Sequence, residues 1–211
     1  MKAVIVSGGA APSDNLLKEE LKSSQILICA DSGGNCLYKN KIVPEYLLGD
    51  FDSIDAKSLD FFRNTDCKIE KYPVNKNFTD TEIAFNKAVE LKADEIVFLG
   101  STGNRIDHLF GNIGMLKKCL NRNIKGYIKD DNNSIEIINK STTIDGHKGE
   151  TFSLYAYCDS VKGLSIIGAK YKLDEYDLIL GDSRTVSNEF LDNEVNIVFK
   201  SGIVLLFRSR D

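Results

Sequence analysis

Short apolar runs alternate with longer segments of helical period over the first 130 residues of the chain. The runs lie at 3–7, 26–30, 46–48, 69–72, 95–99 and 124–128. Thr79 and Glu82 have the spacing of a capping box, which predicts the start of a helix. A second helix is predicted from apolar residues three or four positions apart, which are Ile106, Leu109, Phe110, Ile113, Leu116 and Leu120. Helices alternating with uninterrupted apolar strands predict a parallel sheet that is covered on both faces.

The pattern changes after Asp130. Short runs follow at 134–138, 142–144, 151–157, 164–167, 171–173, 196–199 and 203–207, and Gly, Asn and Asp separate them. Few windows here are long enough for a helix, so an antiparallel sandwich or small barrel is expected. The expected fold class is therefore α/β, with a parallel-sheet domain at 1–132 followed by an all-β sandwich domain at 133–211.

Composition and charge narrow the class of protein. The chain has 211 residues, 42% of them hydrophobic and 27% charged, which is typical of globular proteins. The net charge of -4 argues against a broad surface for nucleic acid or anionic membrane. No apolar run approaches the roughly 20 residues that span a bilayer, and the N-terminus is typical of a strand rather than a signal peptide.

The cysteines and histidines argue against disulfides and zinc. The cysteines are odd in number and form no Cys-x-x-Cys, and they are Cys29, Cys36, Cys67, Cys119 and Cys158. This usage predicts reduced, mostly buried thiols in a cytoplasmic protein. With His108 and His147 as the only histidines, a zinc site is not expected.

Candidate chemistry follows the predicted strands, since ligands of open parallel sheets bind at the carboxyl ends of the strands. Asp50 and Asp52 follow the third run two positions apart, so an extended segment would point both side chains the same way. A hard cation such as Mg²⁺ would relieve their repulsion. The other polar or glycine residues at strand ends or helix starts are Asp31, Ser32, Gly33, Gly34, Thr79, Asp80, Gly100, Ser101, Thr102, Gly103, Arg105, Asp107 and His108.

Each of these features also fits a purely structural role. Asp-x-Asp fits a solvated turn, glycines fit tight turns, and Arg105 with Asp107 fits a surface ion pair. Asp80 fits a residue that complements a helix dipole, and His108 fits a half-buried structural side chain. Together, however, they predict a Mg²⁺–polyphosphate site, because glycine loops and helix N-termini accept anions and arginine binds phosphate through two N–H groups. The patterns of a P-loop and of a standard dinucleotide fold are absent from the sequence.

Several of these motifs, in this order and spacing, resemble the thiamine pyrophosphokinase family. They are Asp31-Ser32-Gly33-Gly34, Gly49-Asp50-Phe51-Asp52-Ser53-Ile54, Phe78-Thr79-Asp80, Gly103-Asn104-Arg105-Ile106-Asp107-His108 and Ser187-Asn188-Glu189. The resemblance implies an α/β nucleotide-binding domain followed by a β-sandwich, in a homodimer with thiamine at the subunit interface. It also implies transfer of the β,γ-diphosphate of ATP to the hydroxyethyl group of thiamine, which gives thiamine diphosphate and AMP.

The resemblance carries roles to individual residues. Asp50, Asp52 and Asp80 are expected to hold Mg²⁺, and with Arg105 and Asp107 they form the expected catalytic set. The residues expected to bind the co-substrate ATP are Asp31, Ser32, Gly33, Gly34, Gly100, Ser101, Thr102, Gly103, Arg105 and His108. Those expected to bind the substrate are Thr79, Asp80, Ser187 and Asn188, although Ser187 and Asn188 also fit a plain turn before a strand.

The chain departs from the family pattern at Asn77, where the family often has an acidic residue. It also has no tryptophan, so any ring that stacks on thiamine must come from Phe or Tyr. Two other classes of function fit the residues. One is a Mg²⁺-dependent nucleotide hydrolase, which would need no acceptor, and the other is a nucleotide sensor without turnover.

Overall fold

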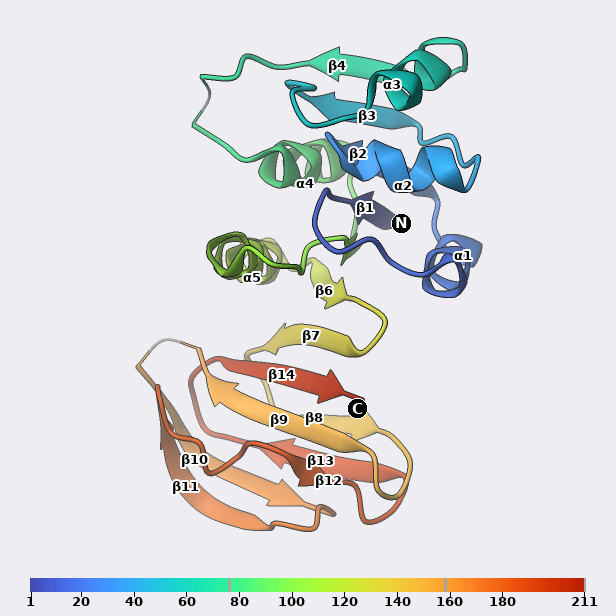
Figure 1. Ribbon diagram of the computed structural model, residues 1–211. Coiled ribbons are helices and arrows are strands. Elements are labelled where there is room, and N and C mark those ends of the chain that lie inside the picture. The colour runs from blue at the N-terminus through green and yellow to red at the C-terminus, as the bar shows by residue number, and fades with distance from the viewer. Residues whose placement is uncertain (76, 158, 211) are drawn as a thin grey trace. The chain divides into compact units, whose positions relative to one another are not determined.

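The structure is a computed structural model that describes residues 1–75, 77–157 and 159–210. The chain divides into two compact units, Met1–Asp131 and Asn132–Asp211 (Figure 1). Each unit has its own secondary structure and its own core, so we describe them separately.

The first unit alternates strands and helices as the sequence pattern predicts. Its elements are β1 (Lys2–Val6), α1 (Asp14–Lys22), β2 (Ile26–Ala30), α2 (Gly33–Lys39), β3 (Tyr46–Gly49), α3 (Ala56–Arg63), β4 (Lys68–Lys71), α4 (Asp80–Glu90), β5 (Glu95–Leu99), α5 (Ile106–Leu120) and β6 (Lys125–Lys129). The strands lie in the order β6-β5-β1-β2-β3-β4, and each neighbouring pair is parallel. The predicted parallel sheet is confirmed.

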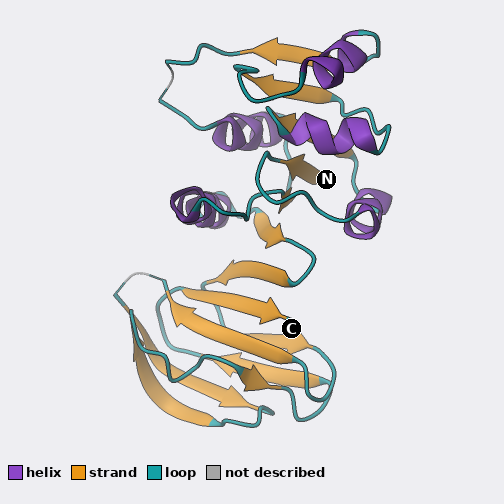
Figure 2. Ribbon diagram, in the orientation of Figure 1, coloured by secondary structure: helices purple, strands orange, loops and turns teal. Residues whose placement is uncertain are grey.

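Helices cover both faces of this sheet, with α1, α2 and α3 on one side and α4 and α5 on the other (Figure 2). Leu17, Leu37 and Phe62, one from each of the first three helices, pack with alternate strand residues in one core cluster. On α4, Ile83, Phe85 and other residues are buried. Because both faces are covered, the central strands are apolar at nearly every position, which explains the uninterrupted runs in the sequence.

The strand order brings the ends of distant strands together. β1 lies between β2 and β5, so the chain extends the sheet from β1 to β4 and then returns to the other side of β1. The order of the strands therefore reverses between β1 and β5. Loops that leave the carboxyl ends of strands at such a point diverge and leave a crevice for a ligand.

The predicted starts of α4 and α5 are both confirmed, but the apolar stripe of α5 is buried only in part. The Thr79 hydroxyl accepts a hydrogen bond from the N–H of Glu82 at 3.2 Å, as a capping residue does. On α5, Leu116 is fully buried, whereas Ile106 is 66% exposed and Phe110 is 70% exposed. The first turns of α5 therefore present an apolar surface that the described residues leave uncovered.

The second unit is an antiparallel β-sandwich, as predicted. Its strands are β7 (Asn133–Ile138), β8 (Thr142–Asp145), β9 (Thr151–Ala156), β10 (Ser160–Ile167), β11 (Leu173–Ile179), β12 (Asn188–Glu189), β13 (Glu194–Val198) and β14 (Val204–Ser209). Within this unit, neighbouring strands follow the order β12-β9-β14-β7 in one layer and β11-β10-β13-β8 in the other. Phe152 and Leu154 of the first sheet share one core cluster with Leu164 and Val195 of the second.

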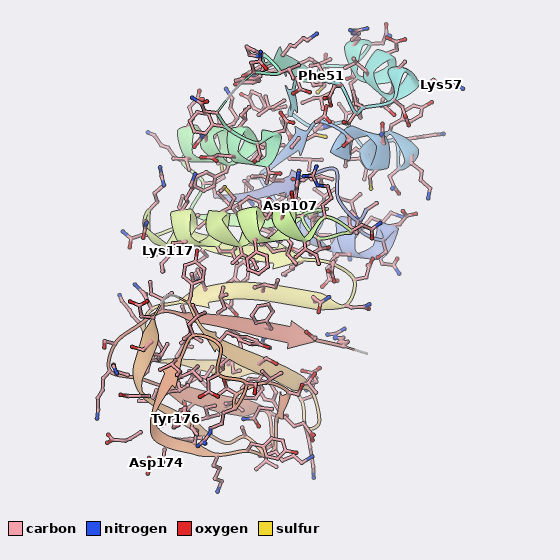
Figure 3. The ribbon with its side chains drawn as sticks, turned by 60° about the vertical axis from the view of Figure 1, so that its left-hand side comes forward. Phe51, Lys57, Asp107, Lys117, Asp174 and Tyr176 are labelled. Atoms are coloured by element: carbon pink, nitrogen blue, oxygen red, sulfur yellow. The ribbon has the colours of Figure 1, made fainter. Side chains whose placement is uncertain are left out.

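Two strands of the sandwich differ from the sequence prediction. The apolar pattern predicted a strand at 171–173, but β11 starts at Leu173 and continues to Ile179. β11 is the edge of its sheet and carries acidic residues, among them Asp174, which Figure 3 labels with Tyr176. Charged side chains are common on edge strands, where they oppose pairing with another chain, so the apolar pattern is weak there. The short strand β12 carried no apolar signal.

Two further sequence predictions concern thiols and membrane spans. Cys29, Cys36, Cys67 and Cys119 are free cysteines, while Cys158 lies outside the described residues. Burial raises the pKa of the Cys119 thiol to about 12, so it carries no thiolate at neutral pH. Among the described helices, none combines the length and the apolar character needed to cross a membrane.

Candidate active site

A cleft of about 780 Å³ opens at the carboxyl ends of the strands of the first unit. Loops after β1, β2, β3 and β5 line it, together with the start of α4 and part of α5. The predicted residues that line it are Asp31, Ser32, Asp50, Asp52, Thr79, Asp80, Gly100, Ser101, Thr102, Gly103, Arg105 and His108. Gly33, Gly34 and Asp107 are absent from its lining, and Ser187 and Asn188 belong to the second unit.

A carboxylate cluster lies in this cleft. One oxygen each of Asp31, Asp50 and Asp52 lies within 4.8 Å of the other two. The family resemblance predicted Asp80 as the metal-binding residue beside Asp50 and Asp52. Asp80 lines the cleft, but Asp31 is the third member of the cluster. The reason is the sheet order, because β2 and β3 are neighbours and their carboxyl ends bring Asp31 next to Asp50.

The backbone of the Asp50–Asp52 segment forms a turn and is not extended. Phe51, labelled in Figure 3, has φ +64°, and the Asp52 N–H donates to Oδ1 of Asp50 at 3.2 Å. The two carboxylates therefore come together through a turn, and the extended geometry expected from their spacing is wrong. Asp31 also has a positive φ of +44°. Left-handed backbone at residues other than glycine is costly and concentrates at functional sites.

The electrostatic state of Asp31 follows from its surroundings. Its side chain is nearly buried, with the residue 7% exposed, and its Oδ1 atom has no hydrogen-bond partner among the described residues. Burial raises the pKa of Asp31, and the charges of Asp80, Asp50 and Asp52 raise it further. A cation in the cluster would give this buried oxygen a partner and would offset the repulsion.

Arg105 and Asp107 form a forked ion pair at the start of α5, where Figure 3 labels Asp107. Nε of Arg105 donates to Oδ1 of Asp107 at 3.2 Å, and Nη2 donates to Oδ2 at 2.5 Å. The pair is exposed, and Arg105 lines the cleft whereas Asp107 does not. The Arg105 guanidinium lowers the pKa of the Asp107 carboxyl. Asp107 thus orients the arginine in this structure.

The glycines of the predicted phosphate loops have different structural reasons. A Cβ on Gly33 would lie 2.3 Å from the carbonyl oxygen of Val6, so this glycine allows α2 to approach the sheet. Gly34 is likewise tightly packed and buried. Gly100 lines the cleft, has φ +61° and has no room for a Cβ beside the Ser7 carbonyl. A phosphate-binding role for Gly33 and Gly34 stays a prediction.

The loop after β1 lines the cleft, although no functional role was predicted for it. Ser7, Gly8 and Gly9 line the cleft, and two hydrogen bonds join this loop to the loop after β5. The Gly9 N–H donates to the carbonyl of Gly100 at 2.7 Å, and the Ala10 N–H donates to that of Thr102 at 2.6 Å. The sequence does contain a signal for this loop, because Gly8 and Gly9 directly follow the first apolar run, where a ligand-binding loop is expected. The other lining residues that carried no prediction include Val74, Thr81 and Asn112.

Ser187 and Asn188 lie in the second unit and differ in accessibility. Ser187 is exposed and has φ +55°, whereas Asn188 is only 2% exposed. Oδ1 of Asn188 accepts from the Tyr171 N–H at 3.0 Å, and its Nδ2 donates to the Tyr171 carbonyl at 2.8 Å. The amide of Asn188 is therefore engaged with the backbone, and its direct contact with a ligand stays a prediction.

Comparison with known proteins identifies the family. The family model described as thiamin pyrophosphokinase, catalytic domain, matches residues 17–128. The model described as thiamin pyrophosphokinase, vitamin B1 binding domain, matches residues 135–204. The chain belongs to the thiamin pyrophosphokinase family. The two matches fall within the first and the second unit respectively.

Relatives and solved structures agree with this membership. A thiamine pyrophosphokinase of Bacillus subtilis is 30% identical, and the match covers 100% of both chains. The crystal structure of the enzyme from B. subtilis has a TM-score of 0.89 at 27% identity and covers 100% of both chains. That of the enzyme from Geobacillus thermodenitrificans has a TM-score of 0.84 at 29% identity and covers 100% of this chain and 98% of the other.

As a member of the thiamin pyrophosphokinase family, the chain is an ATP-dependent thiamine diphosphokinase, an enzyme that forms thiamine diphosphate from thiamine. The resemblance noted in the sequence is confirmed. The identity also decides against a nucleotide sensor without turnover.

Proposed function

We propose that this enzyme transfers the β,γ-diphosphate of ATP to the hydroxyethyl oxygen of thiamine and releases AMP. The ATP and Mg²⁺ sites are assigned to the domain at 1–132, and the thiamine-binding domain is assigned to 133–211. The observation that supports this most is the cluster of Asp31, Asp50 and Asp52 in the cleft of the first unit. Free carboxylates would repel an ATP molecule, so the cluster favours a polyphosphate only together with a cation.

The donor set fits Mg²⁺. The cluster offers only carboxylate oxygens, and Mg²⁺ prefers a few carboxylates together with substrate phosphates and water. The buried Oδ1 of Asp31, which has no partner among the described residues, gives an oxygen that a cation would satisfy. We assign Asp31, Asp50 and Asp52 as the residues that would hold the ion, and Asp80 as a further candidate at the cleft wall. When bound, the ion would offset the charge of the phosphates.

Arg105 is the chain's own phosphate-binding cation in this proposal. Nε and Nη2 of Arg105 donate hydrogen bonds to Asp107, so the Nη1 group can donate to phosphate oxygens. Because Asp107 holds the guanidinium plane, Arg105 is oriented before the nucleotide binds. The glycine-containing loops after β1 and β5 offer backbone at the same cleft, where side chains would otherwise keep phosphates at a distance.

The reaction needs the acceptor to be positioned more than activated. The thiamine oxygen forms a bond to the β-phosphorus while the bond from that phosphorus to the oxygen shared with the α-phosphate breaks. The hydroxyl proton is released, and the electron pair of the broken bond leaves with AMP. Catalysis of such transfers rests on positioning and on charge stabilisation. In this proposal Arg105 contributes positive charge, and the carboxylate cluster would contribute by holding the cation.

We also propose a cytoplasmic homodimer with the thiamine site at the subunit interface and with no nucleic-acid or membrane partner. The exposed apolar residues Ile106 and Phe110 on α5 support an interface between copies, because large apolar patches on soluble proteins mark contact surfaces. Dilution through the dissociation range, followed by light scattering and rate measurement, tests whether activity falls with the dimer.

Analysis of the nucleotide products tests the proposed reaction directly. Chromatography of reactions with Mg-ATP, with and without thiamine, should show AMP only when thiamine is present. The Asp50→Asn variant should lose this product, while Asp66→Asn, which removes an exposed charge outside the cleft lining, should not. Formation of ADP with thiamine would indicate ordinary kinase chemistry, and nucleotide breakdown without thiamine would indicate a hydrolase.

A further inference from the structure

The loop that follows β3 leaves the sheet before it reaches Asp52. Asp50 directly follows the last residue of β3, whereas Asp52 lies two residues further along the loop and is exposed. The strand therefore fixes Asp50 more closely than Asp52. Regular structure resumes at Ala56, where α3 begins. The position of Asp52 thus depends on how the end of the loop, at Ile54 and Asp55, is held.

Two consecutive residues of α2 hold the end of this loop. Oδ1 of Asn35 accepts a hydrogen bond from the Asp55 N–H at 2.9 Å. One residue earlier in both segments, Gly34 lets Ile54 come close, since a Cβ on Gly34 would lie 2.6 Å from Cδ1 of Ile54. Ile54 is buried and shares a core cluster with Leu37 of α2. A polar and an apolar contact therefore join α2 to the loop before α3.

The same helix follows Asp31 directly. Ser32 is the N-cap of α2, and the carbonyl of Asp31 accepts a hydrogen bond from the Gly34 N–H at 3.0 Å. The carbonyl of Ser32 accepts from the Asn35 N–H, also at 3.0 Å. Asn35 therefore links the turn that carries Asp31 to the loop that carries Asp52, on the face of the sheet where α2 and α3 pack (Figure 1).

Asn35 lies outside the site that it supports. It is not one of the described residues that line the cleft, whereas all three aspartates of the carboxylate cluster are. Its side-chain oxygen is engaged with the backbone of Asp55. An effect of Asn35 on a bound ligand must therefore act through the loop and not through a direct contact.

We propose that Asn35 is a positioning residue, which sets the spacing of the carboxylate cluster by holding the Asp55 N–H. The inference rests on the proposed cation site. Because like charges repel, a loop without this hydrogen bond would let Asp52 move away from Asp31 when no cation is present. The hydrogen bond keeps the carboxylates together before the ion binds, and binding is then stronger because less order remains to be imposed.

Binding of Mn²⁺ measures this role without turnover, since carboxylate sites take Mn²⁺ as well as Mg²⁺. Asn35→Leu removes the acceptor at similar volume. It should raise the Kd for Mn²⁺ alone roughly tenfold, measured from the free ion by electron paramagnetic resonance. Asn35→Asp keeps an oxygen for the Asp55 N–H and should bind no more weakly than wild type. The matched control is Asn40→Leu, because Nδ2 of Asn40 donates to the Cys36 carbonyl at 3.1 Å within the same helix end.

The outcomes separate this inference from the cation site. If Mn²⁺ binds the wild-type enzyme neither alone nor with a non-hydrolysable ATP analogue, the cation site itself is overturned. Binding that requires the analogue, or equal binding by Asn35→Leu and wild type, overturns the positioning role alone. An equal loss in Asn40→Leu also overturns it, since a general loosening of α2 would then be the cause. Should Asn35→Leu not fold, Asn35→Gln, which moves the oxygen by one methylene, provides the same test.

Steady-state rates distinguish a positioning residue from a metal ligand. Asn35→Leu should raise the Mg²⁺ concentration for half-maximal rate roughly tenfold and leave kcat at saturating Mg²⁺ nearly unchanged. Asp50→Asn should not recover at any Mg²⁺ concentration. An unchanged Mg²⁺ requirement with a lower kcat in Asn35→Leu would overturn the positioning role.

The hydrogen bond can also be removed from the donor side. Asp55 has a φ of -63°, which proline adopts, and among the described residues its side chain makes no capping hydrogen bond. Asp55→Pro therefore removes mainly the N–H and should weaken Mn²⁺ binding as Asn35→Leu does. The double variant should bind no more weakly than either single variant, because both changes remove one contact. Losses that multiply in the double variant would overturn the role of this hydrogen bond.

Discussion

Replacing Asp50 by asparagine should stabilise the metal-free enzyme and abolish its activity. The amide has nearly the same shape and keeps an oxygen for the Asp52 N–H, so the change removes mainly one charge from the cluster of Asp31, Asp50 and Asp52. At the 4.8 Å limit that bounds this cluster, two unit charges repel by about 3.5 kcal/mol in an effective dielectric of about 20. Asp52 is exposed and Asp50 partly so, and solvent screening reduces the gain to about 1 kcal/mol.

Thermal melting with and without Mg²⁺ measures both the stability of the metal-free enzyme and its response to the cation. For a chain of this length, about 1 kcal/mol raises the melting temperature by roughly 2–4 °C, which is the gain expected for Asp50→Asn in EDTA. The wild-type enzyme should gain stability when Mg²⁺ and a non-hydrolysable ATP analogue are added, and the variant should gain much less. Asp66→Asn removes an exposed charge outside the cleft lining and is the matched control. A variant that melts lower than wild type in EDTA, or that responds equally to Mg²⁺, would refute the cation site.

Three other substitutions test the site and the fold. Arg105→Lys should lower kcat roughly 10- to 1000-fold in steady-state assays, because lysine lacks the fork that Asp107 orients, and a normal rate would make the pair a surface feature. Gly9→Ala should lower the melting temperature by several degrees, because its Cβ would lie 2.1 Å from a carbonyl oxygen. Glu20→Gln should cost about 3 kcal/mol in denaturant unfolding at pH 7. Burial opposes ionisation of Glu20, but Lys129 and Lys2 hold its pKa below 4.5, so wild-type stability should fall with pH below that value and the variant's should fall less.

The sequence was most informative where burial is complete. The central strands are apolar at nearly every position because helices cover both faces, and this pattern alone predicts the parallel sheet. It was least informative at edges. β11 is acidic because it closes its sheet, and the first turns of α5 look like core although Ile106 and Phe110 are exposed. Periodicity identifies the apolar side of a helix, but it contains no information on what covers that side.

The location of the candidate site could be predicted from the sequence, but the residues that come together there could be predicted only in part. The rule that ligands bind beyond strand ends pointed to the loops that line the cleft. The part played by Asp31 depends on which strands are neighbours, and a single sequence does not specify strand order. Asn188 was assigned to ligand binding from its motif, and this stays a prediction; that its amide also binds the backbone of Tyr171 could not be predicted, because a single sequence does not show which distant segment lies beside it.

The two hydrogen bonds that join the loop after β1 to the loop after β5 also limit how this enzyme can be redesigned. Gly9 and Ala10 each donate to a carbonyl of the other loop, so neither loop keeps its shape if the other is replaced. An insertion in one loop would leave backbone groups of its partner without acceptors or donors at the cleft. A graft from a distant relative should therefore transfer both segments together, although some 90 residues separate them in the chain.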